Sequence, residues 1–230
     1  MSALPISSPW VRSPPYALSI ALLLTLAPLG ACGAETPCGS ASLAPPPSPP
    51  AFAVITSDYL STAVALLDSD GERITEAWID SGTTRPGLNT ALSGDVDLPG
   101  AVIAGELVLL DRLDTDLITR IDLTDGSTIA QWHVSPPAIL GEAAFAPNPQ
   151  DLLRLPGGDL LISRFEPNEA PDAGALDRGD DLLRLDGRSG APIARIGLEP
   201  LRARIDGVTV FARPARMLAL DGGLLVGLAR

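Results

Sequence analysis

The 230-residue sequence contains no lysine, a single histidine, two cysteines and only nine aromatic residues (three Trp, two Tyr, four Phe). All 16 basic residues are therefore arginines, against 28 acidic residues, and the net charge is −12. The isoelectric point near 4.4 excludes nucleic-acid binding, because no basic stripe is available to neutralise phosphates. The scarcity of histidine and cysteine excludes a zinc site of the usual ligands and leaves His133 as the base of any catalytic triad. Nine aromatic residues are too few for a sugar-stacking platform.

The first thirty residues predict an export signal. Arg12 precedes the apolar stretch Ala17–Leu29, which is too short to span a bilayer but has the length of a signal-peptide core. The stretch ends in Leu29-Gly30-Ala31-Cys32, which resembles the lipobox of bacterial lipoproteins. That resemblance implies that Cys32 receives a diacylglycerol and becomes the new N-terminus. The alternative is an ordinary secretory signal in which Cys32 is incidental.

Three regions follow from this interpretation: a lipoprotein signal peptide at 1–31, a proline-rich linker at 32–50 and a repeat domain at 51–230. Prolines in the linker favour an extended, semi-rigid spacer between the membrane and the domain; they are Pro45, Pro46, Pro47, Pro49 and Pro50. We expect a lipid-anchored location in the bacterial cell envelope, with the membrane as a partner. Cys38 is then a lone thiol, or pairs with Cys32 if no lipid is attached.

Two sequence units alternate along the repeat domain. In the turn unit, Arg120–Val134 matches Arg184–Leu198 at a constant offset of 64 residues, and Leu66–Ile79 is an earlier copy. Each copy has a turn glycine with an isoleucine three residues later, and an aspartate three or four residues before it. Glycine suits a turn position of positive φ, and the aspartate can cap the turn backbone.

The second unit is led by proline. Asn148–Leu161 matches Arg213–Val226 at an offset of 65 residues, and Leu98–Leu110 is a shortened relative. The proline indicates the start of a strand, and paired glycines indicate a hairpin turn. Short apolar runs between Asp, Gly and Pro clusters are typical of strands, and no helix is predicted from residue 51 onward.

One unit of each kind makes a four-stranded module, and radial repetition of such modules is the β-propeller architecture. Asp181–Leu198 resembles the third and fourth strands of the YVTN-type propeller repeat of bacterial surface and periplasmic proteins. Asn148–Phe165 is similar to the other half of that repeat, with Leu161–Arg164 reading Leu-Ile-Ser-Arg in place of Tyr-Val-Thr-Asn. The resemblance covers about residues 52–230 and implies a fold rather than a function.

The repeats therefore predict an all-β fold, an incomplete β-propeller of about three four-stranded blades. The first module starts near Phe52 with three strands, two complete modules follow, and the last has two strands, about 13 in total. Closed propellers have four to eight blades. We hypothesise a fragment of a longer product, or a chain that another chain completes.

Four polar residues are the candidate ligand-binding residues: Asn148, Arg164, Asn168 and Arg213. In a propeller they would lie near one end of the central channel, where ligands commonly bind. The alternative is that they mark strand starts or are solvated. Three Asp-rich clusters carry ligands suited to Ca²⁺, but none fits the twelve-residue calcium loop, so a role in turns is favoured; they are Asp68–Glu72, Asp111–Asp116 and Asp177–Asp181. We predict no metal site and no cofactor.

These observations favour an envelope-anchored binding or scaffold module with a protein or small-ligand partner. The sequence offers no nucleophile–base pair and no cofactor motif, and His133 has no visible catalytic partner. An enzyme is therefore disfavoured. The alternatives are a fragment of a propeller hydrolase or redox enzyme, and a truncated product without a function of its own.

Overall fold

The computed structural model describes residues 45–229, except 47, 85–86, 113–114 and 136–144. Cys32, Cys38, the predicted signal peptide and most of the predicted linker lie outside the described residues. Within the described part, the protein has 15 strands and one short 3-10 helix, η1 (Glu199–Leu201). The same residues include no helix that is long and apolar enough to cross a membrane.

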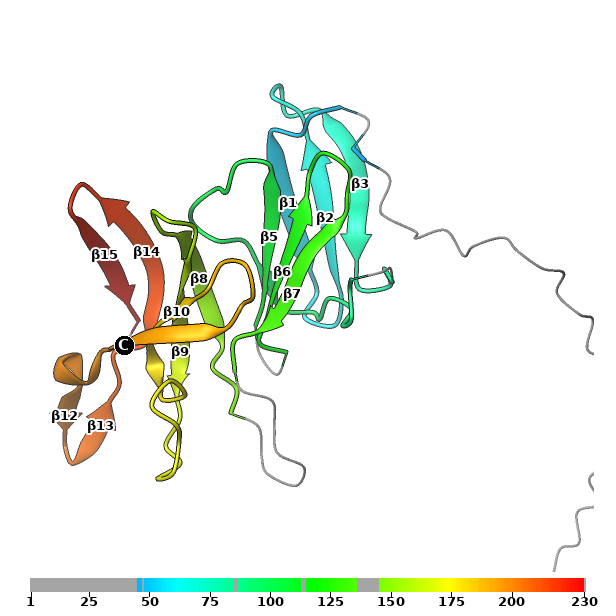
Figure 1. The fold of residues 1–230 in the computed structure, drawn as a ribbon. Helices are drawn as coiled ribbons and strands as arrows, with labels where there is room; N and C mark the ends of the chain where they lie inside the picture. Colours follow the sequence, from blue (N-terminus) through cyan, green and yellow to red (C-terminus); the bar gives the residue numbers. More distant parts are fainter. Residues whose placement is uncertain (1–44, 47, 85–86, 113–114, 136–144, 230) are drawn as a thin grey trace, which may run out of the picture. The chain divides into compact units, whose positions relative to one another are not determined.

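The strands form antiparallel sheets that follow one another along the chain (Figure 1). The first sheet contains β1 (Phe52–Ser57), β2 (Thr62–Leu67) and β3 (Arg73–Asp80). The second sheet contains β4 (Val96–Asp97), β5 (Glu106–Asp111), β6 (Leu117–Asp122) and β7 (Thr128–His133). The third sheet contains β8 (Pro149–Arg154), β9 (Leu160–Pro167), β10 (Gly179–Leu185) and β11 (Pro192–Gly197). The fourth sheet contains β14 (Pro214–Leu220) and β15 (Gly223–Leu228).

This organisation confirms the predicted modules. The third sheet joins a proline-led hairpin, β8-β9, to a turn-unit hairpin, β10-β11. In the second sheet the hairpin β4-β5 takes the place of the proline-led hairpin, but β4 ends at Asp97, so the predicted strand start at Pro99 is wrong. The four sheets have three, four, four and two strands, as the repeats predict. The protein is therefore all-β, with the sheet organisation of an incomplete propeller.

One hairpin was not predicted. The strands β12 (Ala203–Ile205) and β13 (Val208–Val210) form a two-stranded sheet between the third and fourth sheets. Three residues are too few to show a period of two, and the hairpin has no counterpart in the other modules. Its turn is Asp206-Gly207, with φ of 50° and 82°. An Asp-Gly pair with positive φ at both residues is a strong hairpin signal.

The turn chemistry is as predicted. The repeated turn glycines Gly71, Gly126 and Gly190 have φ of 81°, 72° and 73°. The aspartate before each turn accepts hydrogen bonds from turn amides: Asp68 from the amide of Asp70 at 2.9 Å, and Asp186 from the amide of Ser189 at 2.7 Å. Because these preferences act within a few residues, the turns could be located from sequence.

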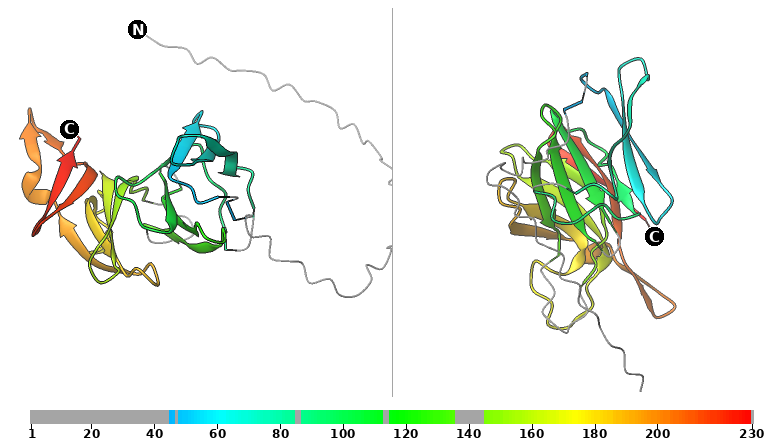
Figure 2. Two further views of the ribbon diagram at one scale, coloured as in Figure 1. Left: turned by 90° about the horizontal axis from the view of Figure 1, so that it is seen from above. Right: turned by 90° about the vertical axis from the view of Figure 1, so that its right-hand side faces the viewer.

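Three hydrophobic clusters of buried side chains lie between successive sheets. The ribbons of these sheets are shown from two further directions in Figure 2. Strand β5 is buried on both faces: Leu107 and Leu109 join the cluster of the first sheet, whereas Val108 and Leu110 join that of the third sheet. This alternation is the period of two expected of a strand. Because both faces of β5 are covered, its sequence is a continuous apolar run rather than an alternating one.

Candidate functional site

Asn148 and Arg213, two of the predicted ligand-binding residues, hold equivalent positions immediately before β8 and β14. Both have positive φ, 52° and 49°. The amide of Asn148 donates to Asp116 Oδ1 at 2.8 Å, and the amide of Arg213 donates to Asp180 Oδ1 at 2.6 Å. Both carboxylates are buried and belong to the preceding sheet's module. The backbone at these positions therefore joins each sheet to the next.

The side chain of Arg213 is 41% exposed. Its guanidinium lies 4.9 Å from the ring centre of Phe165 and 3.3 Å from Glu166 Oε2. The side-chain oxygen of Asn148 accepts a 2.6 Å hydrogen bond from the side-chain amide of Gln150. The two predicted site residues thus stand in separate surroundings, one at each sheet junction.

Arg164 is fully buried. Its Nε and Nη2 donate to the two carboxylate oxygens of Asp181, both at 2.8 Å, and Nη2 also donates to the Leu176 carbonyl. Asp181 lies opposite Arg164 on the neighbouring strand and also pairs with Arg195. The bidentate pair joins β9 to β10, and the contact with the Leu176 carbonyl holds the loop before β10. The Arg164 guanidinium has no exposed surface in this arrangement. Its predicted contact with a ligand stays a prediction.

Asn168 lies in the loop between β9 and β10. Its side-chain amide donates to the Asp177 carbonyl at 2.9 Å and to Asp177 Oδ2 at 3.2 Å. Arg164 Nη1 lies 3.8 Å from Asp177 Oδ1, so Asp177 brings these two predicted residues together. Burial raises the pKa of Asp177 above its ordinary value, against the opposing effect of Arg164. The group stabilises the loop through its own hydrogen bonds.

A buried aspartate that sequence reasoning missed joins β8 to β14 and to the loop after β4. Asp151 of β8 is fully buried, and its Oδ1 accepts the Gly100 amide at 2.7 Å. Its Oδ2 accepts the Met217 amide of β14 at 2.6 Å. Arg216 of β14 pairs in turn with Asp97 of β4 at 2.7 Å. The Asp151 contacts and the Arg216–Asp97 ion pair together join β8, β14 and the β4 region.

Among the described residues, no group of three or more His, Cys, Asp or Glu side chains could hold a metal ion. His133 lies exposed at the end of β7.

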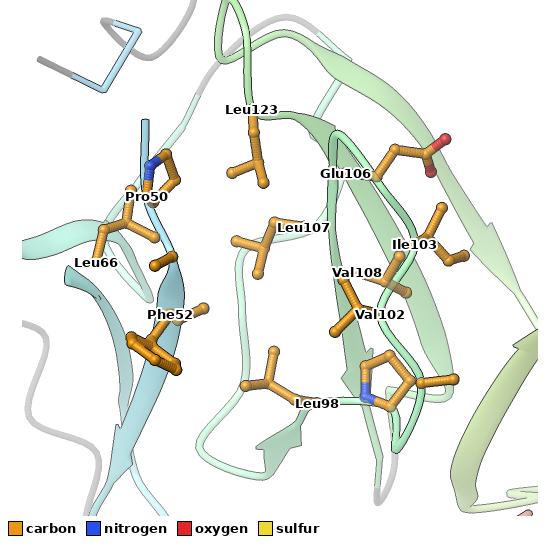
Figure 3. Close-up of a pocket in the computed structure, with 14 residues that line it drawn as sticks. Pro50, Phe52, Leu66, Leu98, Val102, Ile103, Glu106, Leu107, Val108 and Leu123 are labelled. Carbon is orange, nitrogen blue, oxygen red and sulfur yellow. The ribbon is translucent and has the colours of Figure 1, made fainter. Parts of the chain in front are cut away.

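An apolar cavity of about 250 Å³ lies between β1 and the segment Leu98–Val108 (Figure 3). The side chains shown around it come from the start of β1, the end of β2, the loop after β4, β5 and the turn after β6: Phe52, Leu66, Leu98, Val102, Leu107 and Leu123. Phe52 is 55% and Val102 94% exposed, so the cavity opens to solvent. Sequence reasoning missed it because its walls come from two different modules.

The charged residue in the cavity lining is Glu106. Its carboxylate is paired with Arg120 at 2.8 Å and with Arg154 at 3.3 Å. The cavity therefore presents mainly carbon surface, and its volume suits one apolar side chain or a small apolar group.

No known protein family matches the chain, and no curated protein matches it significantly. Solved structures are similar to it at low identity, among them the following two. A protein of unknown function from Bacteroides caccae is 16% identical, with a TM-score of 0.39 over 77% of this chain and 57% of that one. BamB from Moraxella catarrhalis is 15% identical, with a TM-score of 0.36 over 76% of this chain and 39% of BamB. The chain thus spans between two fifths and three fifths of the length of these structures. At such scores neither likeness bears on function, and the fold rests on the sheets themselves.

Proposed function

We propose that this protein is a lipid-anchored binding module of the bacterial cell envelope, held by Cys32 and binding an apolar group of its partner in the cavity beside β1. The observation that carries the proposal is the open apolar cavity, because soluble surfaces seldom leave such patches uncovered unless they bind something. The contacts of the predicted polar residues join sheets and hold a loop, so the binding part of the proposal rests on the cavity.

The anchoring part rests on the lipobox-like Leu29–Cys32 after a short apolar stretch. Replacing the attachment residue, Cys32→Ala, should move the protein from the membrane fraction to the soluble fraction and remove the lipid adduct from its intact mass. The matched control is Cys38→Ala, which should leave both unchanged. Unaltered fractionation of Cys32→Ala, with no lipid adduct on the native chain, would show that the anchor is misassigned.

The binding part can be tested with toluene as a small apolar probe. A ligand tenfold above its Kd stabilises the native state by about 1.4 kcal/mol. For a domain of this size the melting temperature should rise by about 3–5 °C at that toluene concentration. Val102→Asp places a charge at the cavity mouth and should abolish the rise. The control Leu60→Asp changes a residue that is also strongly exposed, at 87%, but does not line the cavity. No toluene shift in the native protein would contradict the proposal.

A further inference from the structure

We infer that the first sheet accepts an extended segment of a partner protein as its innermost strand, with an apolar side chain of that segment in the cavity. This inference rests on the proposed function and names its partner class.

The other three sheets show the position that the segment would take. In each of them a proline-led or short inner strand pairs with the next strand along the chain: β4 with β5, β8 with β9 and β14 with β15. β1 is the repeat equivalent of β5, β9 and β15, and it lies at the edge of its sheet. Among the described strands, β2 is the only one that pairs with β1. The described residues therefore supply no strand at the inner position beside β1.

The residues just before β1 are poorly suited to fill this position. In the other sheets the inner strand directly precedes its neighbour, and here the equivalent stretch holds Pro45, Pro46, Pro47, Pro49 and Pro50. Proline has no amide hydrogen to donate to a ladder. The described residues of this stretch form no strand. This composition favours a strand from another segment at this position.

The free edge of β1 lacks the features that protect exposed edges. Its sequence, FAVITS, has no charged residue and no proline, and Phe52 and Val54 are 55% and 40% exposed. Soluble proteins usually guard such edges with charges, prolines or bulges, because unpaired backbone groups recruit further strands. Addition of an extended segment to a sheet edge is an established mode of recognition.

The inner strands present in the protein indicate the chemistry of the segment. In β8, which belongs to the third sheet, Leu153 is 5% exposed and lies in the cluster between the third and fourth sheets. A segment beside β1 would likewise direct an apolar side chain between the first and second sheets, where the cavity lies. The net charge of −12 disfavours acidic segments. The expected partner segment is extended, apolar at alternating positions, and neutral or basic.

A labelled peptide copying Asn148–Gly157, NPQDLLRLPG, tests this inference against the mature lipidated protein in nanodiscs, with empty nanodiscs as background. Fluorescence anisotropy should show saturable binding that falls at least tenfold with Val102→Asp and stays unchanged with Leu60→Asp. Two N-methylated peptides provide the test of strand pairing, one methylated at Leu152 and Arg154 and the other at Leu153 and Leu155. Alternate amides of a strand face opposite edges, so one peptide should lose binding and the other should retain it.

Three results would overturn the inference: no saturable binding, equal binding by both methylated peptides, or loss of binding by both. If the peptide fails while toluene still stabilises the protein, strand addition is wrong and the apolar binding site stands. If both fail, the proposed function fails as well. Self-association of the protein through β1 without peptide binding would replace the partner segment by a second copy of this chain.

Discussion

Replacing Asp151 by asparagine should measure how strongly the inner strands are held together. The carboxylate is fully buried and faces only amide donors: Gly100 and Leu152 on Oδ1, and Met217 on Oδ2. Asparagine has one acceptor oxygen and one amino group, so either orientation places a donor against a backbone donor. The variant must lose at least one contact to a neighbouring segment.

The magnitude follows from those contacts. A hydrogen bond to a charged group contributes about 1.5–3 kcal/mol, and an unsatisfied buried amide adds a desolvation cost. We expect Asp151→Asn to lower the free energy of unfolding by about 2–3 kcal/mol. For a domain of this size that corresponds to a melting temperature lower by about 5–10 °C.

Urea unfolding followed by tryptophan fluorescence measures this loss. The control is Asp70→Asn in the exposed turn between β2 and β3, which should change stability by less than about 0.5 kcal/mol. If Asp151→Asn is as stable as the native protein, the carboxylate does not hold the inner strands.

Two further substitutions test other contacts. Burial raises the pKa of the Asp111 carboxyl. The folded state therefore binds a proton at Asp111 more tightly than the unfolded state does. Native stability falls as the pH rises from the ordinary aspartate pKa through the raised pKa. In Asp111→Asn the side-chain amide can still hydrogen-bond to the backbone amide and the hydroxyl of Ser93. The variant should therefore be at least as stable as the native protein at pH 7, and any gain in its free energy of unfolding should vanish in acid. A free energy of unfolding lower by more than about 1 kcal/mol at pH 7 would contradict this expectation. Gly71→Ala should cost about 1 kcal/mol for its positive φ alone, whereas Gly190→Ala should cost about 2–4 kcal/mol because a Cβ there would overlap Trp132. Equal losses in thermal unfolding of the two glycine variants would refute the contact.

The strands and turns could be predicted because their signals are local and repeated. The turn glycines with their capping aspartates recur at fixed spacing, and the same offsets align the proline-led strands. Leucine-rich strands such as β5 have weak strand propensity, and repetition located them where propensity could not.

The site could not be predicted in the same way, because it depends on register between segments far apart in sequence. Arg164 reads as a polar residue near a strand end, and only its pairing with Asp181 shows that it is buried. Asp151 contacts amides 51 and 66 residues away. The cavity needs the first and second sheets to face each other, which no single repeat encodes.

The most direct test of the account is amide hydrogen exchange across residues 52–57, with and without the NPQDLLRLPG peptide. If the open edge of β1 takes a strand, exchange of these amides should slow when the peptide binds, while exchange in β7, an outer edge strand, stays unchanged. Unchanged exchange in β1, or protection centred on another sheet, would contradict a propeller-like module that binds its partner at this edge.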